Sequence, residues 1–265
     1  MQIKSGSDLE RAFFISDVHL GHGTKESERA KQIELLRFLD IVGQSSGKLF
    51  IVGDFFDVWF EYKLAVPKGF VRVLGKLAEL VDSGVEVFYV LGNHDFWVRN
   101  YFEDEIGIKV FKDDLKVELN GKKFYIIHGD GLSKDDIGYK VLKKILRNGT
   151  SIFLYSLFHP DLGLKLASAF SRKSREYSTN RASVSENRLR EEKSMIEFAQ
   201  GKIEDGFDYV VMGHLHKPGI KKLGDGYYVN IGDWLWNFTY GFFETEFEIK
   251  KWEFTSDEVK KLLQK

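Results

Sequence analysis

Short apolar segments alternate with amphipathic stretches through the first hundred residues, and this alternation is the feature that most constrains the fold. Residues 12–16 (AFFIS), 49–52 (LFIV) and 85–91 (VEVFYVL) are predicted to be buried strands. A helix is expected after Thr24, with an apolar stripe of Ile33, Leu35, Leu36, Leu39 and Ile41. A second helix is expected to bury Val71, Val73, Leu74, Leu77, Leu80 and Val81. The resulting strand–helix–strand order predicts an α/β fold with parallel strands.

The remainder of the chain predicts more strands and one helical interruption. Residues 114–119 and 122–127 flank Asn120-Gly121, a strong hairpin-turn signal. Further strands are expected at 209–212, 227–231 and 243–249. Residues 134–181 are helical in character and carry ten Lys or Arg against four acids. We therefore interpret residues 1–265 as a single domain with a helical insertion, or lid, at about 134–181.

Composition excludes several classes of function. Lys and Arg total 39 against 40 Asp and Glu, so the overall charge does not favour a nucleic-acid partner. The absence of cysteine excludes disulfides, thiolate metal sites and cysteine nucleophiles. Neither a signal peptide nor an apolar run long enough to span a bilayer is recognisable, so a cytoplasmic location is expected.

Five polar motifs each follow a predicted strand. They are Asp17-X-His19, Gly53-Asp54, Gly92-Asn93-His94-Asp95, His128-Gly129-Asp130 and Gly213-His214-X-His216. Ligands of open α/β sheets collect at the carboxyl ends of the strands, so these motifs are expected to converge. A single histidine of this kind is more often a packed core residue. Here five of the seven histidines lie in strand-end motifs, which argues for a shared site.

The residue types in these motifs suit a pair of metal ions. The candidate ligands are Asp17, His19, Asp54, Asn93, His128, His214 and His216. Carboxylate, imidazole and amide ligands favour manganese, iron, zinc or magnesium over copper(I). Two such ions about 3.5–4 Å apart are suited to hydrolysis at phosphorus. The sequence therefore predicts a two-metal phosphoesterase.

The remaining polar residues near these motifs allow two interpretations each. Asp57 either orients a metal ligand or caps the following turn, and Asp95 either binds His94 or caps a helix before Phe96. His22 is expected to be a solvated loop residue, with an approach to the site as the alternative. His159 precedes Pro160 and is expected to pack or cap locally.

The order of these motifs resembles that of the calcineurin-like metallophosphoesterases over roughly residues 12–233. The resemblance implies a four-layer αββα sandwich with a dinuclear centre, in which manganese is expected, with zinc or iron as alternatives. One metal would be held by Asp17, His19, Asp54 and His216. The other would be held by Asp54, Asn93, His128 and His214. The bridging Asp54 and the side chain of His94, which would contact the phosphate and protonate the leaving oxygen, are the expected catalytic residues.

A narrower resemblance is to the UDP-2,3-diacylglucosamine pyrophosphohydrolases of lipid A biosynthesis. It rests on the aromatic stretch after Asp54, on HGD-X-L followed by D-D-X-X-Y, on a basic helical lid, and on Gly232-Asp233-Trp234. It implies a lipid-linked sugar nucleotide substrate cleaved to UMP and 2,3-diacylglucosamine 1-phosphate. The expected substrate contacts, besides His94, are Asp136, Tyr139, Arg172 and Ser174. The chain departs from that family in one motif, with GNHD where GNRD is usual.

The lid is expected to handle lipid, because its basic residues alternate with apolar clusters such as residues 152–155. Such a segment either lies peripherally on the inner face of the cytoplasmic membrane or forms an acyl-chain cleft. The alternative is an ordinary amphipathic cap, and core packing is the alternative for Tyr139. Another phosphoesterase acting on nucleotides, phosphodiesters or phosphoproteins is the second functional candidate, and a non-enzymatic scaffold is the third.

Overall fold

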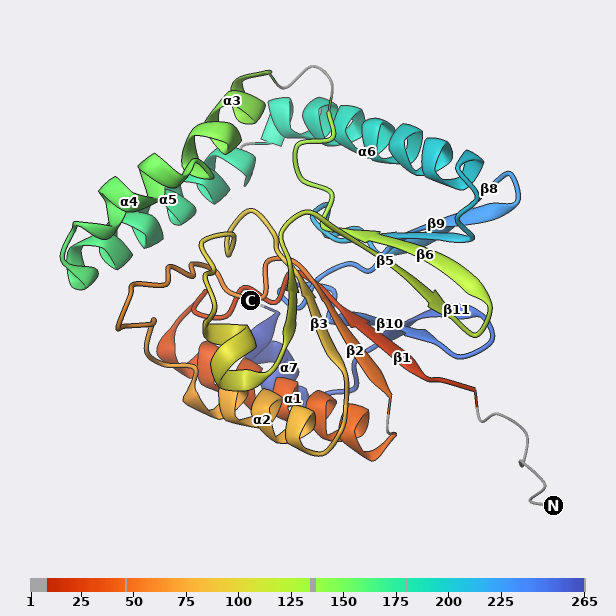
Figure 1. Cartoon of the computed structure of the whole chain (residues 1–265), viewed down its shortest axis with the longest axis horizontal. Coiled ribbons are helices and arrows are strands. Elements are labelled where there is room, and N and C mark those ends of the chain that lie inside the picture. Colours follow the sequence, from red (N-terminus) through yellow and green to blue (C-terminus); the bar gives the residue numbers. More distant parts are fainter. Residues whose placement is uncertain (1–8, 46, 134–136, 180, 265) are drawn as a thin grey trace.

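Two β-sheets are stacked face to face, with helices on both outer sides (Figure 1). The structure is a computed structural model that describes residues 9–45, 47–133, 137–179 and 181–264. Helices α1 (Lys25–Gln44) and α2 (Val71–Asp82) cover one sheet, and α6 (Arg181–Glu204) covers the other. This confirms the αββα sandwich that the sequence predicts.

The first sheet has six strands in the order β11-β10-β1-β2-β3-β4. Its parallel strands are β1 (Ala12–Ile15), β2 (Lys48–Val52), β3 (Val87–Val90) and β4 (Lys109–Phe111). Two antiparallel strands complete it, β10 (Thr239–Phe243) and β11 (Phe247–Lys251). The parallel arrangement places the carboxyl ends of β1, β2 and β3 at one edge of the sheet.

The second sheet has five strands in the order β5-β6-β7-β9-β8. Their bounds are β5 (Asp114–Leu119), β6 (Lys122–Ile127), β7 (Tyr209–Met212), β8 (Gly219–Leu223) and β9 (Gly226–Asn230). The predicted hairpin around Asn120-Gly121 is present as β5 and β6. Because β6, β7 and β9 are parallel, their carboxyl ends also share one edge.

The two sheets are held together by rows of aromatic rings. Phe14, Phe50 and Phe88 lie on neighbouring parallel strands, and their rings stack with centroids 4.8 Å apart at each step. From the opposite sheet, the ring of Phe124 stacks on Phe14 at 5.9 Å and on Tyr209 at 4.8 Å. This buried aromatic interface fixes the relative position of the two sheets, and with it the strand ends that each sheet contributes to the site.

The segment predicted to be a helical lid forms helices that extend past one end of the sandwich (Figure 1). It contains α3 (Ile137–Leu146), α4 (Gly149–Ser156) and α5 (Pro160–Thr179), and α6 returns the chain to the second sheet. Helical structure thus continues to Glu204, beyond the predicted limit at 181. Within the described residues, no helix combines the length and the apolar character needed to cross a bilayer.

Two details of the sequence-based predictions are wrong. Ile33 and Ile41 on α1 are exposed rather than buried, because the helix turns Phe38 and Val42 toward the sheet along with Leu35 and Leu39. Val71, the first residue of α2, is also exposed. The expected strand 243–249 is the connection between β10, which ends at Phe243, and β11, which begins at Phe247. Alternating polar residues in that segment reflect a hairpin turn, since residues 244–246 leave the sheet.

A buried carboxylate joins α1 to the segment after β11, which leads into helix α7 (Asp257–Leu263). Glu34 accepts hydrogen bonds from Trp252 Nε1 at 2.9 Å and from the Thr255 hydroxyl at 2.5 Å, and it pairs with Arg37. Burial opposes the charged form of Glu34, but these hydrogen bonds outweigh it and lower the pKa of Glu34 below its usual value. The ionised carboxylate therefore stabilises the folded state above pH 4.5, and this stabilisation is lost as the pH falls further.

We expect Glu34→Ala to reduce the free energy of unfolding by about 3 kcal/mol, because the buried Trp252 N–H would lose its acceptor. Urea denaturation followed by circular dichroism measures this. The matched control is Glu79→Ala on α2, where an exposed ion pair with Lys76 is lost, and about 0.5 kcal/mol or less is expected. Equal losses in the two variants, or a loss that does not shrink toward pH 3, would contradict this account.

Candidate metal centre

Strand-end turns from both sheets meet at one edge of the sandwich. The turn after β1 carries Asp17 and His19, and the turn after β2 carries Asp54. The turns after β3, β6 and β7 bring in the remaining candidates, Asn93, His94, His128, His214 and His216. The structure therefore brings together all seven predicted metal ligands and His94, although they are separated by up to two hundred residues in the chain.

The backbone of these turns is strained. Within the described residues, seven non-glycine positions have a left-handed φ, and five of them are candidate ligands: Asp17, His19, Asp54, His214 and His216. Such conformations cost free energy and persist only where surrounding contacts fix them. Here the turns bind one another, because the backbone N–H of Asp17 donates to Gly53 O and that of His19 donates to Asp54 O. The strained backbone positions therefore lie mainly where the polar side chains converge.

Two motif glycines allow the strand ends to approach closely. A Cβ atom on Gly53 would overlap the imidazole ring of His128, and one on Gly92 would overlap the carboxylate of Asp54. Any larger residue at either position would force the neighbouring ligand out of place. The glycines of the GD and GN motifs are thus explained by packing around the candidate ligands.

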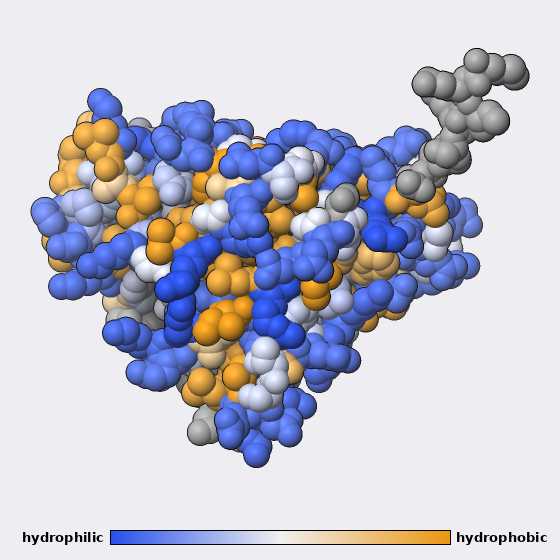
Figure 2. Space-filling model, turned by 90° about the horizontal axis from the view of Figure 1, so that it is seen from below, coloured by the Kyte–Doolittle hydropathy of each residue, from blue (hydrophilic) through white to orange (hydrophobic). Residues whose placement is uncertain are grey.

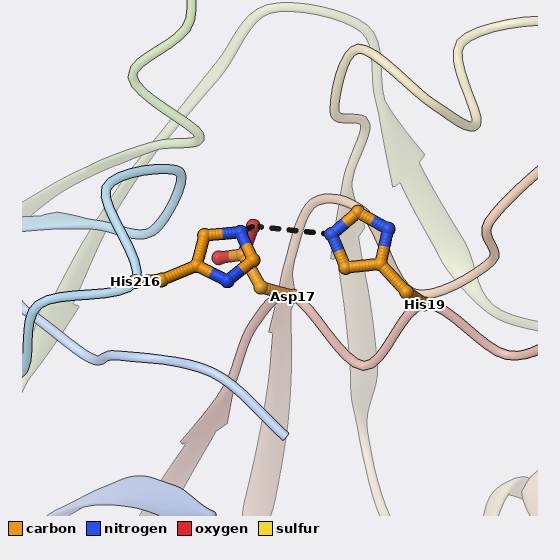
Figure 3. A group of neighbouring side chains, drawn as sticks. All are labelled: Asp17, His19 and His216. Atoms are coloured by element: carbon orange, nitrogen blue, oxygen red, sulfur yellow. Dashed lines mark ion pairs between the residues drawn. The ribbon is translucent and has the colours of Figure 1, made fainter. Parts of the chain in front are cut away.

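One group of ligand atoms is formed by Asp17, His19 and His216, whose atoms lie within 4.8 Å of one another. The Asp17 carboxylate lies between the two imidazole rings (Figure 3). Its Oδ1 atom is 3.2 Å from His216 Nε2 and 3.8 Å from His19 Nε2. Among the described residues, this buried oxygen has no hydrogen-bond donor. An acceptor left in this state fits the coordination of a cation.

A second group is formed by Asp54, His128 and His214, also within 4.8 Å. Asp54 Oδ2 is 3.3 Å from His128 Nε2 and 3.8 Å from His19 Nε2, so the same oxygen faces both groups. Asn93 Oδ1 lies 3.2 Å from His128 Nε2. This is the arrangement that a carboxylate bridging two ions requires.

The ring nitrogens that point away from the centre face acceptors. His128 Nδ1 donates to Val52 O at 2.9 Å, which leaves Nε2 directed toward Asp54. His19 Nδ1 lies 3.6 Å from Asp57, and His216 Nδ1 lies 3.9 Å from Asp233. These two distances are too long for hydrogen bonds but place a carboxylate behind each ring. Asp57 thus lies beside a candidate ligand, as the first of its two interpretations requires.

The electrostatics of the centre favour positive charge. Burial opposes protonation of His19 and His128, but the surrounding carboxylates outweigh it and raise the pKa of His19 to about 9 and that of His128 to about 10. Burial likewise opposes ionisation of Asp54, yet His128 and His94 hold its pKa well below the usual value. A buried site that attracts protons this strongly is suited to divalent cations, which interact with the same carboxylates and imidazoles.

His94 lies beside both groups. Its backbone N–H donates to Asp54 Oδ1 at 2.8 Å, and its ring packs 4.8 Å from that of His19. The ring Nδ1 lies 3.0 Å from Asp57 O, an acceptor, so Nδ1 carries the proton and Nε2 remains available to a ligand. Burial lowers the pKa of His94 below its usual value.

Asp95 has neither of the roles considered from the sequence. Its carboxylate accepts hydrogen bonds from the backbone N–H groups of Phe55 at 2.7 Å and Gly92 at 2.8 Å, and from the hydroxyl of Tyr89. No helix begins at Phe96 in the structure. Asp95 thus ties the turn after β2 to the turn after β3, and positions Asp54 against the neighbouring ligands.

The predicted substrate contacts are placed only in part. The Tyr139 hydroxyl donates to Asp130 at 3.0 Å, and Lys143 pairs with the same carboxylate at 2.6 Å. Asp136 lies outside the described residues, and Arg172 and Ser174 lie on α5 with side chains outside the description. His22 is partly exposed in its loop, and the imidazole of His159 is largely exposed.

Two residues from the helical segment contact the centre without having been predicted. Ser171 on α5 is buried, with its hydroxyl 3.2 Å from His94 Nδ1 and 3.3 Å from Asp57 Oδ1. Glu191 on α6 lies 2.9 Å from His214 Nε2. Both come from helices with no recognisable motif around them. The only sequence signal was their place in or just after the predicted lid.

The chain is similar to known proteins over most of its length. Residues 11–218 match the model of the calcineurin-like phosphoesterases. A UDP-2,3-diacylglucosamine hydrolase of Porphyromonas gingivalis is 33% identical over 237 residues, which cover 85% of this chain and 90% of the relative. One of Pseudomonas fluorescens is 33% identical over 228 residues, covering 83% and 86%. Among solved structures, an archaeal phosphodiesterase has 15% identity and a TM-score of 0.45, with 91% of this chain and 98% of the other covered.

We expect Asp54→Ala to lower the affinity for metal by at least about 100-fold, because one oxygen faces both ligand groups. Hydrolysis of a chromogenic phosphodiester should fall at least as much, while far-ultraviolet circular dichroism stays unchanged. Metal content after dialysis measures the first effect. His159→Ala, which changes an exposed histidine away from the centre, is the control and should behave as wild type. Full metal content in Asp54→Ala would contradict the assignment.

Proposed function

Because this chain belongs to the calcineurin-like phosphoesterases, we propose that it hydrolyses UDP-2,3-diacylglucosamine to UMP and 2,3-diacylglucosamine 1-phosphate, a reaction of lipid A biosynthesis. The observation that carries the proposal is the 33% identity to a hydrolase of that name over 85% of the chain. The gathering of every predicted ligand at one edge of the sandwich supports the same reaction.

In this proposal Asp17, His19 and His216 would hold one ion, Asn93, His128 and His214 would hold the other, and Asp54 would be shared between them. We propose manganese as the metal, with zinc or iron as alternatives, because no ligand is a thiolate. Two divalent ions supply activation of the attacking water and neutralise charge on the phosphoryl oxygens. The protein contributes a fixed set of metal-ligand atoms, because the turns that carry them are hydrogen-bonded to one another.

His94 is proposed to bind the phosphate and protonate the leaving oxygen. Its Nδ1–H is held by Asp57 O, so Nε2 is the nitrogen that faces a bound ligand. Burial favours the neutral ring in the free protein. A diphosphate bound beside it places negative charge next to the imidazole, which raises the pKa of His94 and favours the protonated form. The proton is therefore available when the substrate is in place.

The lid is proposed to bind the acyl chains and to contact the membrane surface. It is anchored on the body by Tyr155, whose ring packs 4.7 Å from Phe60 and 4.8 Å from Trp97. Large apolar side chains are exposed along it, namely Ile145, Phe153, Leu154, Leu157, Phe158, Leu162, Leu166 and Phe170. Hydrophobic areas are visible at this end of the molecule, on the left in Figure 2. An exposed apolar surface of this kind suits a lipid partner.

The substrate contacts proposed for this lid are Asp136, Tyr139, Arg172 and Ser174, together with His94.

One observation favours the second candidate function, a phosphoesterase for soluble nucleotides, diesters or phosphoproteins. The chain has His94 at the position where the diacylglucosamine hydrolase family usually has arginine. Histidine binds a diphosphate through one hydrogen bond, whereas a guanidinium forms two.

The decisive experiment is a mass-spectrometric assay of the full-length protein with manganese and UDP-2,3-diacylglucosamine. Release of UMP together with the diacylglucosamine 1-phosphate is expected. Active hydrolysis of bis(p-nitrophenyl) phosphate without any UMP release from the lipid substrate would overturn the proposal and favour the second candidate.

We expect the double variant Phe153→Ser/Leu157→Ser to lower kcat/KM for the diacyl substrate by tenfold or more, because each lost apolar contact is worth roughly 1.5–3 kcal/mol when fully buried. Turnover of bis(p-nitrophenyl) phosphate should change by less than about twofold, since the variant leaves the metal centre intact. Ile33→Ser, an exposed apolar residue on α1, is the matched control and should affect neither substrate. Equal losses on both substrates would argue against a lipid-binding lid.

A further inference from the structure

Glu191 reaches the metal centre from a helix that carries none of the motif residues. Its carboxylate Oε1 lies 2.9 Å from His214 Nε2, and the side chain is two-thirds shielded from solvent. The helix that carries it, α6, lies along the second sheet and contacts β7, the strand that leads into His214. The contact therefore joins the helical segment of the chain to a proposed metal ligand.

The position of Glu191 determines which nitrogen of His214 carries the proton. An ionised carboxylate only accepts hydrogen bonds, so Nε2 must be the donor and carry hydrogen. In the neutral ring, Nδ1 then has the free electron pair. The backbone of His214 is itself fixed, because its N–H donates to Asp17 Oδ2 at 2.8 Å. Both the backbone and the distal ring nitrogen are therefore held, and Nδ1 is left for the ion.

His128, in the same ligand group, has the opposite ring nitrogen fixed by a hydrogen bond. Its Nδ1 donates to Val52 O, and its Nε2 faces Asp54. The backbone carbonyl that fixes His128 belongs to the core strand β2. His214, by contrast, depends on a side chain supplied by α6. Of the two imidazoles in this group, only His214 is oriented by the helical segment.

We propose that Glu191 is a positioning residue that holds His214 in the tautomer presenting Nδ1 to the second metal ion. It makes affinity at that site depend on the docking of α6. The inference rests on the proposed metal centre, but it is independent of the proposed substrate.

The docking of α6 is well defined next to Glu191. Met195 follows one turn later on the same face of the helix and is completely buried. A Cβ atom on Gly129, directly after His128, would contact the methyl group of Met195, so the helix lies against the turn that carries this ligand. This packing fixes the position and rotation of α6 next to the metal centre, and thereby directs the Glu191 carboxylate toward His214.

The adjacent residue provides a matched control. Glu192 has the same side chain, but it forms an ion pair with Lys217 at 2.7 Å and not with a histidine. Removing Glu192 therefore tests the general effect of losing a carboxylate from α6. Removing Glu191 tests its specific contact with His214.

The first experiment measures metal retention in the loaded full-length protein by titration with EDTA, followed by elemental analysis. Glu191→Ala is expected to lower the affinity of one of the two ions by 10- to 100-fold, as loss of a histidine-orienting carboxylate does. Glu191→Gln should restore most of the affinity, because the amide oxygen still accepts from Nε2–H. Glu192→Ala should retain both ions as wild type does. Unchanged retention in Glu191→Ala would overturn the proposal, and so would a Glu191→Gln variant as weak as Glu191→Ala, which would indicate a direct ligand.

The second experiment identifies the nitrogen that binds the ion. Nitrogen–proton correlation spectra of the zinc-loaded protein, labelled with ¹⁵N-histidine, distinguish protonated from metal-bound ring nitrogens, and His214→Asn assigns the signals. The expected result is a protonated Nε2 and a metal-bound Nδ1 for His214. A metal-bound Nε2 would overturn the proposal. Neither experiment uses a substrate, so failure of the diacylglucosamine assay would leave this inference standing.

Discussion

The centre depends on one carboxylate. Asp54 Oδ2 faces His19 from one turn of the first sheet and His128 from the second sheet, so the two ligand groups share a single oxygen. This sharing is possible only if the two sheets are fixed relative to each other to within a fraction of an ångström. The stacked aromatic rings between the sheets provide that rigidity, and Asp95 holds the turn of Asp54 against the turn after β3. The fold thus serves mainly to place strand ends from two layers around one side chain.

Much of this arrangement could be predicted from the sequence because its signals are local. A short apolar run followed by Asp or His marks a strand end, and the hairpin at Asn120-Gly121 is specified by two residues. Every predicted metal ligand consequently lies in the cluster. The ligand-bearing turns are also where the backbone is strained, and strain of this kind is invisible in a residue pattern. The motifs nevertheless contain an indirect sign of this close packing. They have glycine at positions 53 and 92, where any side chain would collide with a candidate ligand.

Predictions failed where the outcome depends on which face a helix turns to its neighbour. Ile33 and Ile41 have the right spacing for a buried stripe, yet α1 is rotated so that Phe38 and Val42 are buried in their place. The same limit applies to Ser171 and Glu191. Each lies on a helix without a functional motif, and only the docking of that helix against the sandwich brings a polar side chain to the centre. Periodicity specifies that a helix forms, but packing between elements specifies what it touches.

The two helices whose contacts with the centre could not be predicted from the sequence, α5 and α6, also lie between the proposed lipid-binding surface and the candidate metal centre. The lid presents the apolar surface proposed to bind acyl chains, and its α5 places Ser171 against His94. The following helix, α6, places Glu191 against His214. A shift of these helices would alter the environment of a proposed phosphate-binding residue and of a proposed metal ligand together. The core sandwich therefore carries the candidate ligands of the phosphoesterase family, and in our proposals the helical segment both selects the substrate and completes the orientation of the groups that act on it.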